Sequence, residues 1–124
     1  MTSVNDPNEL LLRLMSASTL RAKVLSENVA NQNVPGYKRR VVRFEELLAD
    51  RLAHAASTGK GGSLADIQPR IDTDKASPSS PDGNNVSLEL ENNAMRENWL
   101  LYETYAAILQ SRNEMMRASI SEGR

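Results

Sequence analysis

The sequence is poor in the residue types on which many enzymes and secreted domains depend. It contains no cysteine, which excludes disulfide bridges, thiol nucleophiles and cysteine-ligated metal sites. It has one tryptophan, three tyrosines and one phenylalanine among 124 residues, so we expect a thin hydrophobic core. Neither charge sign dominates, with 15 basic and 16 acidic side chains. This balance argues against nucleic acid or an anionic membrane as the main partner.

Long hydrophobic runs are also missing. No stretch approaches the ~18 apolar residues of a membrane-spanning helix. Residues 1–9 contain two acidic side chains and no basic one, and the three leucines that follow are interrupted at once by Arg13. A secretory signal has a longer apolar region preceded by positive charge. We therefore expect no cleaved signal peptide and no insertion into a membrane.

Motifs for catalysis or metal binding are not recognisable. The single histidine, His54, has no second ligand at a metal-binding distance in sequence, and we interpret it as a surface residue. No Gly-x-Ser-x-Gly motif is present. The carboxylate pairs Glu45/Glu46 and Asp72/Asp74 are interpreted as solvated. We expect no catalytic residue, no cofactor, no metal and no small-molecule substrate.

The first regular pattern covers residues 8–32 and predicts a helix. Apolar positions alternate in steps of four and three, which is the heptad pattern of a helix that packs along one seam. Pro7, with Asn5 or Asp6 before it, suits the start of this helix. The seam positions are Leu11, Met15, Ser18, Ala22, Leu25, Val29 and Gln32.

The strongest pattern covers residues 87–120 and predicts a second, longer helix with Ser87 as its N-cap. Its seam positions are Leu88, Asn92, Met95, Trp99, Tyr102, Ala106, Leu109, Asn113, Met116 and Ile120. A flanking apolar stripe contains Ala94, Leu101, Ile108 and Met115. Because buried seam asparagines commonly fix helix register, Asn92 and Asn113 are predicted register residues; the alternative is that both reach solvent.

The middle of the chain has a different character. Val41 and Val42 favour extended structure, and residues 44–56 predict a short amphipathic helix. Residues 57–84 are rich in glycine, serine and proline, and we expect a flexible spacer at 57–63 and loop beyond it. The basic cluster Lys38, Arg39, Arg40 and Arg43 is interpreted as a solvated face.

These patterns predict a mainly all-α fold. The long N- and C-terminal helices are expected to pair as an antiparallel coiled-coil hairpin, with a short helix and a loop-rich, partly extended middle insertion. One domain would then have three parts, residues 1–38, 39–84 and 85–124. Helices of roughly 37 and 50 Å exceed the ~14 Å radius of gyration of a compact chain of this length, so we expect lateral assembly with other copies or relatives.

A turn signal follows the first helix. Residues 28–38 read Asn-Val-Ala-Asn-Gln-Asn-Val-Pro-Gly-Tyr-Lys, and Pro-Gly suits the centre of a type II turn. This run resembles the N-terminal signature of the bacterial flagellar rod, hook and hook-associated proteins, with Val34 where threonine is more usual. The matching signature positions are Asn28, Ala30, Asn31, Pro35, Gly36 and Tyr37.

A second resemblance lies before and within the last helix. Residues 82–91 read Asp-Gly-Asn-Asn-Val-Ser-Leu-Glu-Leu-Glu, and residues 95–102 read Met-Arg-Glu-Asn-Trp-Leu-Leu-Tyr. This combination is similar to the proximal rod members of the same family, with Ser87 where aspartate is usual. Both ends of the chain match the family, whereas the middle does not.

The resemblance implies a structural subunit without enzymatic activity. Members pair their terminal helices into a coiled coil that lines a tubular structure, and the flagellar type III apparatus exports them without processing. Proximal rod proteins lie in the periplasmic space at the rod base, near the export gate, the MS-ring and a FliE-type adaptor. Their partners would be other copies and other rod proteins. The residues expected in subunit packing are Leu11, Met15, Ala22, Leu25, Val29, Leu88, Met95, Trp99, Tyr102, Ala106, Leu109 and Met116.

Three alternatives remain at this point. The chain could be another rod protein of the same family. It could be a free-standing helical adaptor or chaperone of the export apparatus, which would fold alone and bind one partner at defined stoichiometry. A small enzyme is the third alternative, and it requires a rigid pocket with a paired acid and base.

Overall fold

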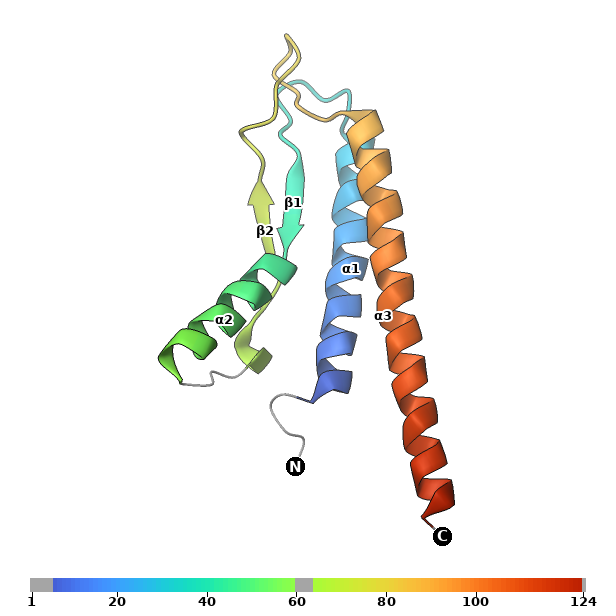
Figure 1. The fold of residues 1–124 in the computed structure, drawn as a ribbon. Coiled ribbons are helices and arrows are strands. Elements are labelled where there is room, and N and C mark those ends of the chain that lie inside the picture. The colour runs from blue at the N-terminus through green and yellow to red at the C-terminus, as the bar shows by residue number, and fades with distance from the viewer. Residues whose placement is uncertain (1–5, 60–63, 124) are drawn as a thin grey trace.

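The computed structural model describes residues 6–59 and 64–123 and is mainly helical (Figure 1), which confirms the predicted fold class. Three α-helices account for most of it. One short strand lies between the first and second helices, and a short 3-10 helix and a second strand lie between the second and third. In chain order the elements are α1 (Pro7–Ala30), β1 (Arg40–Arg43), α2 (Glu45–Thr58), η1 (Leu64–Asp66), β2 (Arg70–Thr73) and α3 (Leu88–Glu122).

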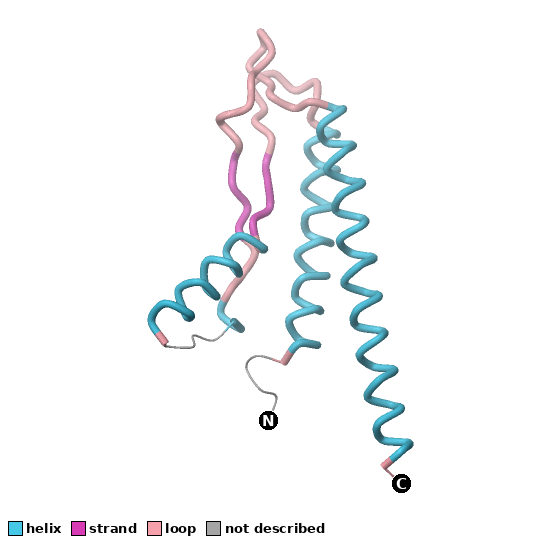
Figure 2. Tube along the Cα trace, viewed as in Figure 1, coloured by secondary structure: helices cyan, strands magenta, loops and turns pink. Residues whose placement is uncertain are grey.

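The long helices α1 and α3 pack side by side and run in opposite directions, as Figures 1 and 2 show. α1 has 24 residues and α3 has 35, so α3 is longer by about three turns. The Asp6 carboxylate accepts a hydrogen bond from the Asn8 amide at 3.0 Å and caps α1. The Ser87 hydroxyl accepts from the Leu90 amide at 3.5 Å and caps α3. The predicted starts of both helices are confirmed.

The middle segment forms a two-stranded antiparallel sheet with α2 attached to it (Figure 2). Strand β1 contains the predicted extended residues Val41 and Val42, and Val42 pairs with Ile71 of β2. Helix α2 runs to Thr58 and ends at Gly59, whose φ of 66° forms a left-handed C-cap. The expected spacer therefore begins too early, because residues 57 and 58 are helical; residues 60–63 lie outside the described residues.

The largest apolar cluster lies between α1 and the middle segment. Ala17 of α1 and Phe44 are almost completely buried, and Leu48 of α2 and Ile67 close the cluster. The Arg13 guanidinium donates to the Ile67 carbonyl at 2.8 Å and so holds the η1 region against α1. The core is thin, as the shortage of aromatic residues predicts. It binds one flank of α1 to the middle segment and leaves another flank for α3.

Candidate functional site

The two stretches that resemble the flagellar family lie against each other where α1 ends and α3 begins. The Gly36 amide donates to the Asp82 carbonyl at 2.9 Å, and the Asn85 amide donates to the Tyr37 carbonyl at 3.3 Å. We call residues 28–40 and 82–91 together the signature clamp. The clamp therefore joins two stretches that lie far apart in the sequence.

The asparagines of the signature clamp act as bridges between the two stretches. The Asn84 side chain donates at 2.8 Å to the carbonyls of both Asn31 and Val34, and its oxygen accepts from the Val86 amide at 2.8 Å. Asn84 is 3 % exposed. Each of these carbonyls also accepts a backbone amide, from Val34 and Tyr37 respectively, so the Asn84 side chain adds a second hydrogen bond to each and ties the turn to residues 82–86.

Two glycines allow the stretches to approach. Gly36 and Gly83 have φ of 75° and 86°, in the left-handed region that favours glycine. A Cβ placed on Gly83 would lie 3.3 Å from the Gly36 Cα atom. The Tyr37 amide donates to the Val34 carbonyl at 3.2 Å, so the predicted turn around Pro35 and Gly36 is confirmed.

Asn28 is fully buried at the centre of the clamp and uses both ends of its amide. Its nitrogen donates to the Arg40 carbonyl at 2.8 Å and to the Glu91 carboxylate at 3.3 Å. Its oxygen accepts from the Arg40 amide at 2.9 Å and from the Tyr37 hydroxyl at 3.0 Å. Only a side chain that both donates and accepts fits this position, which gives a physical reason for asparagine at the first signature position.

A buried charge network extends the clamp into the sheet. Glu91 has no exposed surface, and its Oε1 accepts from Arg39 Nε at 2.5 Å. Arg39 also donates from a terminal nitrogen to Asp74 at 2.9 Å. The hydrogen bond to Glu91 raises the pKa of Arg39 despite its partial burial. Hydrogen bonds from the Ser77 hydroxyl and from Arg39 lower the pKa of Asp74.

Within the basic cluster only the Arg39 side chain is largely covered, so the interpretation as a solvated face is wrong for Arg39 and holds for Arg43. Lys38 donates to the Gly83 carbonyl at 2.5 Å, and Arg40 pairs with Glu27. Only Arg43 is classed as exposed, and it pairs with Asp72 at 2.9 Å. The interpretation as solvated holds for Asp72, whose ion pairs lie at the surface, but Asp74 is largely covered and pairs with Arg39. Sequence reasoning missed these pairs because each partner lies at least a dozen positions away along the chain.

A second polar cluster joins the three helices. Arg21 of α1 forms an ion pair with Glu45 of α2 at 2.5 Å and donates to the Asn98 side chain of α3 at 3.1 Å. Burial raises the pKa of Glu45, but the hydrogen bonds from Arg21 and other donors outweigh burial and lower it overall. The Tyr105 hydroxyl donates to Glu45 at 3.4 Å, and burial raises the pKa of Tyr105.

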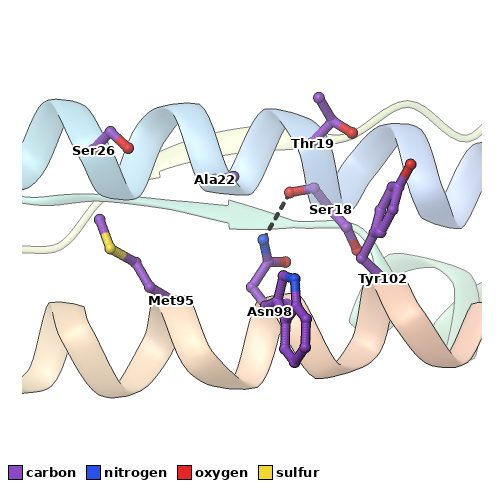
Figure 3. Close-up of a pocket in the computed structure, with 8 residues that line it drawn as sticks. Ser18, Thr19, Ala22, Ser26, Met95, Asn98 and Tyr102 are labelled. Atoms are coloured by element: carbon purple, nitrogen blue, oxygen red, sulfur yellow. Dashed lines mark hydrogen bonds between the residues drawn. The ribbon is translucent and has the colours of Figure 1, made fainter.

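Most of the predicted seam lines an open groove between α1 and α3 (Figure 3). Two hollows, of about 340 and 310 Å³, lie between these helices, and we call them the seam groove; Figure 3 shows the larger one. The larger is lined by Ser18, Thr19, Ala22, Ser26, Met95, Asn98, Trp99 and Tyr102. The smaller is lined by Met15, Ala106, Leu109, Gln110, Asn113, Glu114 and Arg117. Strand β1 passes behind the helices in this view of the larger hollow.

Trp99 does not pack against α1 as expected within the chain. It is 63 % exposed and forms part of the groove wall, and the seam residues Leu88, Tyr102 and Met116 are also exposed. On α1, Leu11 and Leu25 are buried, Met15 and Val29 are partly buried and Ala22 is exposed. On α3, Met95, Ala106 and Leu109 are partly buried. The role of these residues in packing between subunits stays a prediction.

The predicted register residues Asn92 and Asn113 are exposed, so they do not fix the helix register inside this chain. The buried polar residues of α3 are instead Glu91 and Asn98, which sequence reasoning missed. They lie one position before Asn92 and Trp99, on the edge of α3 that contacts α1 and the middle segment. A stripe of polar residues spaced by seven could have revealed them.

Further features of the described residues bear on metal binding and on membrane insertion. His54 is exposed. Across residues 6–59 and 64–123, no three histidine, aspartate or glutamate side chains gather in a way that could hold a metal ion. Within the same ranges, no helix has the length and apolar character needed to cross a membrane.

Comparison with known proteins gives one consistent result. No family model matches the chain. A flagellar basal body rod protein FlgB from Cereibacter sphaeroides is 31 % identical over 119 residues, covering 90 % of this chain and 91 % of the relative. The FlgB proteins of Aeromonas hydrophila and Yersinia ruckeri are 30 % and 29 % identical, over 79 % and 83 % of this chain and 80 % and 85 % of their own lengths. The resemblance seen in the sequence is confirmed, and the chain belongs to the family of the flagellar basal body rod protein FlgB.

Proposed function

We propose that the chain is a structural subunit of the proximal rod, the part of the flagellar drive shaft that transmits torque and encloses the export channel. Membership of the FlgB family supports the assignment to the rod of the basal body. The finer assignment to a load-bearing subunit rests on one observation, the open seam groove between α1 and α3. In this proposal the role is mechanical and the chain catalyses no reaction.

The seam groove has the properties of a surface that a neighbouring helix covers. Trp99 is 63 % exposed and Tyr102 is 37 % exposed, and both line the larger hollow with Ala22 and Met95. Large apolar side chains gathered in a hollow at the surface commonly indicate an interaction site. Small residues on the α1 wall, such as Ala22 and Ser26, would let another helix approach closely.

The proposed packing uses the two seams together. The seam residues of α1 and α3 would contact helices of neighbouring subunits in coiled-coil fashion, so that many modest lateral contacts share the load. The neighbours would be other copies and other rod proteins. At the rod base they would include a FliE-type adaptor, the MS-ring and the export gate. The subunit would reach this periplasmic position through the export channel, without a cleaved signal peptide.

The signature clamp would give each subunit a rigid end. It binds the end of α1, the start of α3 and strand β1 by buried hydrogen bonds and the Arg39–Glu91 ion pair. Because the buried polar groups of the clamp bond to one another, these groups are not available to hold a neighbour. We infer that it fixes where the chain leaves α1 and leaves lateral contacts to the helices.

Deletion of the gene in the source bacterium tests the proposal, with basal bodies imaged by electron cryotomography. We expect rings without a rod, and restoration of the rod by the wild-type gene. Trp99→Asp should fail to restore it, since a charge would enter the seam groove. Leu100→Asp is the matched control, because Leu100 is 60 % exposed and does not line the hollow. A complete rod in the deletion strain would contradict the proposal and favour the adaptor alternative.

A further inference from the structure

Four polar residues recur at intervals of seven along α3, namely Glu91, Asn98, Tyr105 and Arg112. Seven residues make close to two helical turns, so the four side chains lie along one edge of the helix. Glu91 and Asn98 are buried, and Tyr105 and Arg112 are partly buried. We call these four residues the polar ladder.

The first two residues of the ladder bond to the part of α1 between Ser18 and Asn28. Glu91 accepts from the Asn28 side chain at 3.3 Å. The Asn98 nitrogen donates to the Ser18 carbonyl at 2.8 Å, and the Asn98 oxygen accepts from Arg21 at 3.1 Å. The polar groups of both residues are thus paired across the contact between the two helices.

The other two residues continue the pattern toward the far end of the helix pair. The Tyr105 hydroxyl donates to Glu45 at 3.4 Å, and Arg112 Nε donates to the Asn8 side chain at 3.0 Å. From Glu91 to Arg112 the partners on α1 therefore run from Asn28 back to Asn8, whereas Tyr105 bonds to Glu45 of α2. Each residue of the ladder bonds to different partners, and each pair combines a donor with an acceptor.

The apolar seam distinguishes only weakly between registers that differ by one heptad. Sliding α3 by seven residues, about 10 Å, brings Tyr102 to the place of Met95 and Leu109 to the place of Tyr102. Apolar residues would still take these places, although Asn113 would take the place of Ala106. The spare length of α3 would keep α1 covered, and Asn92 or Asn93 could cap the shortened helix.

The polar ladder does distinguish them. In the shifted register Asn98 would face Asn28 and Arg39, and the Glu91 carboxylate would leave the buried site. Arg39 would then keep only Asp74 as a charged partner. Removing one partner from a buried ion pair is costly because a desolvated charge is left without compensation. A seven-residue step thus changes the seam chiefly at one position, from Ala106 to Asn113, but it removes a buried ion pair from the ladder.

We propose that the polar ladder is a register key, which fixes the axial position of α3 on α1. It does so by disfavouring seven-residue shifts that the apolar seam tolerates. Glu91, paired with Arg39, contributes most because it alone places a full charge in a site without exposed surface. The inference concerns the single chain and does not depend on the proposed function. It also decides which residues stand opposite one another across the seam groove.

Spin labels can measure the register, since the chain has no cysteine of its own. Lys23→Cys on α1 and Ser119→Cys on α3 place labels at exposed positions far apart along the helix pair. Double electron–electron resonance then reports their distance. The decisive variant exchanges two residues of the ladder, Glu91→Asn with Asn98→Glu, and leaves composition and apolar seam unchanged. We expect the main distance to shorten by about 10 Å, as the carboxylate returns to Arg39.

The control changes two exposed polar residues of α3 that lie outside the ladder. Asn92→Asp with Asn113→Asp should keep the wild-type distance. An unshifted distance in the exchange variant would overturn the proposal, and the signature clamp alone would then fix the register. If the exchange variant loses its helical circular dichroism, the same distance is measured in a second variant that carries only Glu91→Gln. A second, shorter distance supports the register key, whereas one unshifted distance or loss of helix overturns it.

Discussion

Gly83 stands so close to Gly36 that a Cβ on the first would lie 3.3 Å from the Cα of the second. The contact joins the two stretches that mark the family, and both glycines have positive φ. We predict that Gly83→Ala destabilises the chain by about 1–3 kcal/mol, through backbone strain and displacement of the turn at Gly36. Unfolding in urea, followed by circular dichroism, measures the loss.

Gly59→Ala provides the matched control for this prediction. Gly59 also has positive φ, yet a Cβ there would meet no atom within 4 Å. Gly59→Ala should therefore introduce backbone strain without a steric contact, and it should lower the free energy of unfolding by less than Gly83→Ala does. Equal urea midpoints for the two variants would show that the approach of the glycines adds nothing.

A change at Asn28 that removes its amide donor or adds a charge should destabilise the chain. In Asn28→Asp the side chain can no longer donate to the Arg40 carbonyl, and a second carboxylate would lie beside buried Glu91. We predict a loss of about 3–5 kcal/mol in the free energy of unfolding, as for other uncompensated buried charges. Thermal melts measure it. The same change at Asn33, which is exposed, should leave the melting temperature nearly unchanged, and equal effects at both positions would remove Asn28 from the clamp.

We predict that the contribution of the Asp74 carboxylate to the stability of the chain decreases at low pH. Hydrogen bonds from Ser77 and Arg39 lower its pKa in the folded chain. Its stabilisation is therefore complete above the ordinary aspartate pKa of about 3.9, and it is lost as the pH falls through the lower folded value. Asp74→Asn should unfold more readily than the wild type at pH 7, and the gap should narrow as the pH falls below about 4.

Denaturant midpoints at several pH values test this sign. Asp50→Asn is the control, because Asp50 is exposed. Its difference from the wild type should stay small throughout. A gap for Asp74→Asn that widened toward low pH would contradict the assigned role of the carboxylate.

Variants of Phe44 and Trp99 distinguish residues that stabilise the isolated chain from residues that act in assembly. Phe44 is 1 % exposed, so Phe44→Ala should cost about 3–5 kcal/mol in the isolated chain. Trp99 is 63 % exposed, and Trp99→Ala should change the same quantity by less than about 0.5 kcal/mol, as at other surface sites. Its effect should appear instead as loss of rods in cells. If both variants destabilise the isolated chain equally, Trp99 packs within the chain in solution.

Local signals in the sequence account for the elements that could be predicted. Asp6 and Pro7 start α1, Ser87 caps α3, and Pro35-Gly36 makes the turn, each through hydrogen bonds within a few residues. Strand β2 could not be placed as surely, since its partner β1 lies about thirty residues away. Periodicity alone does not show that such strands meet.

The heptad pattern also has a limit as a guide to the candidate site. It identifies an apolar face on α3, but it cannot say whether the chain itself covers that face. The edge that α3 turns toward α1 carries Glu91 and Asn98, since their partners Arg39 and Arg21 are charged and partly buried. Specific polar pairing therefore decides the orientation of the helix, and the face with Trp99 is left open.

The arrangement of α1 and α3 resembles a beam fixed at one end. Hydrogen bonds crowd around Asn28 and Asn84, whereas the last turns of α3 extend past the start of α1 (Figure 1) and expose Met115, Met116 and Ile120. A sideways load on the free end would deflect it far more than the fixed end. Stiffness in each copy is thus unequal along its length, and a stack of such beams would be rigid only where each tip is supported by its neighbour.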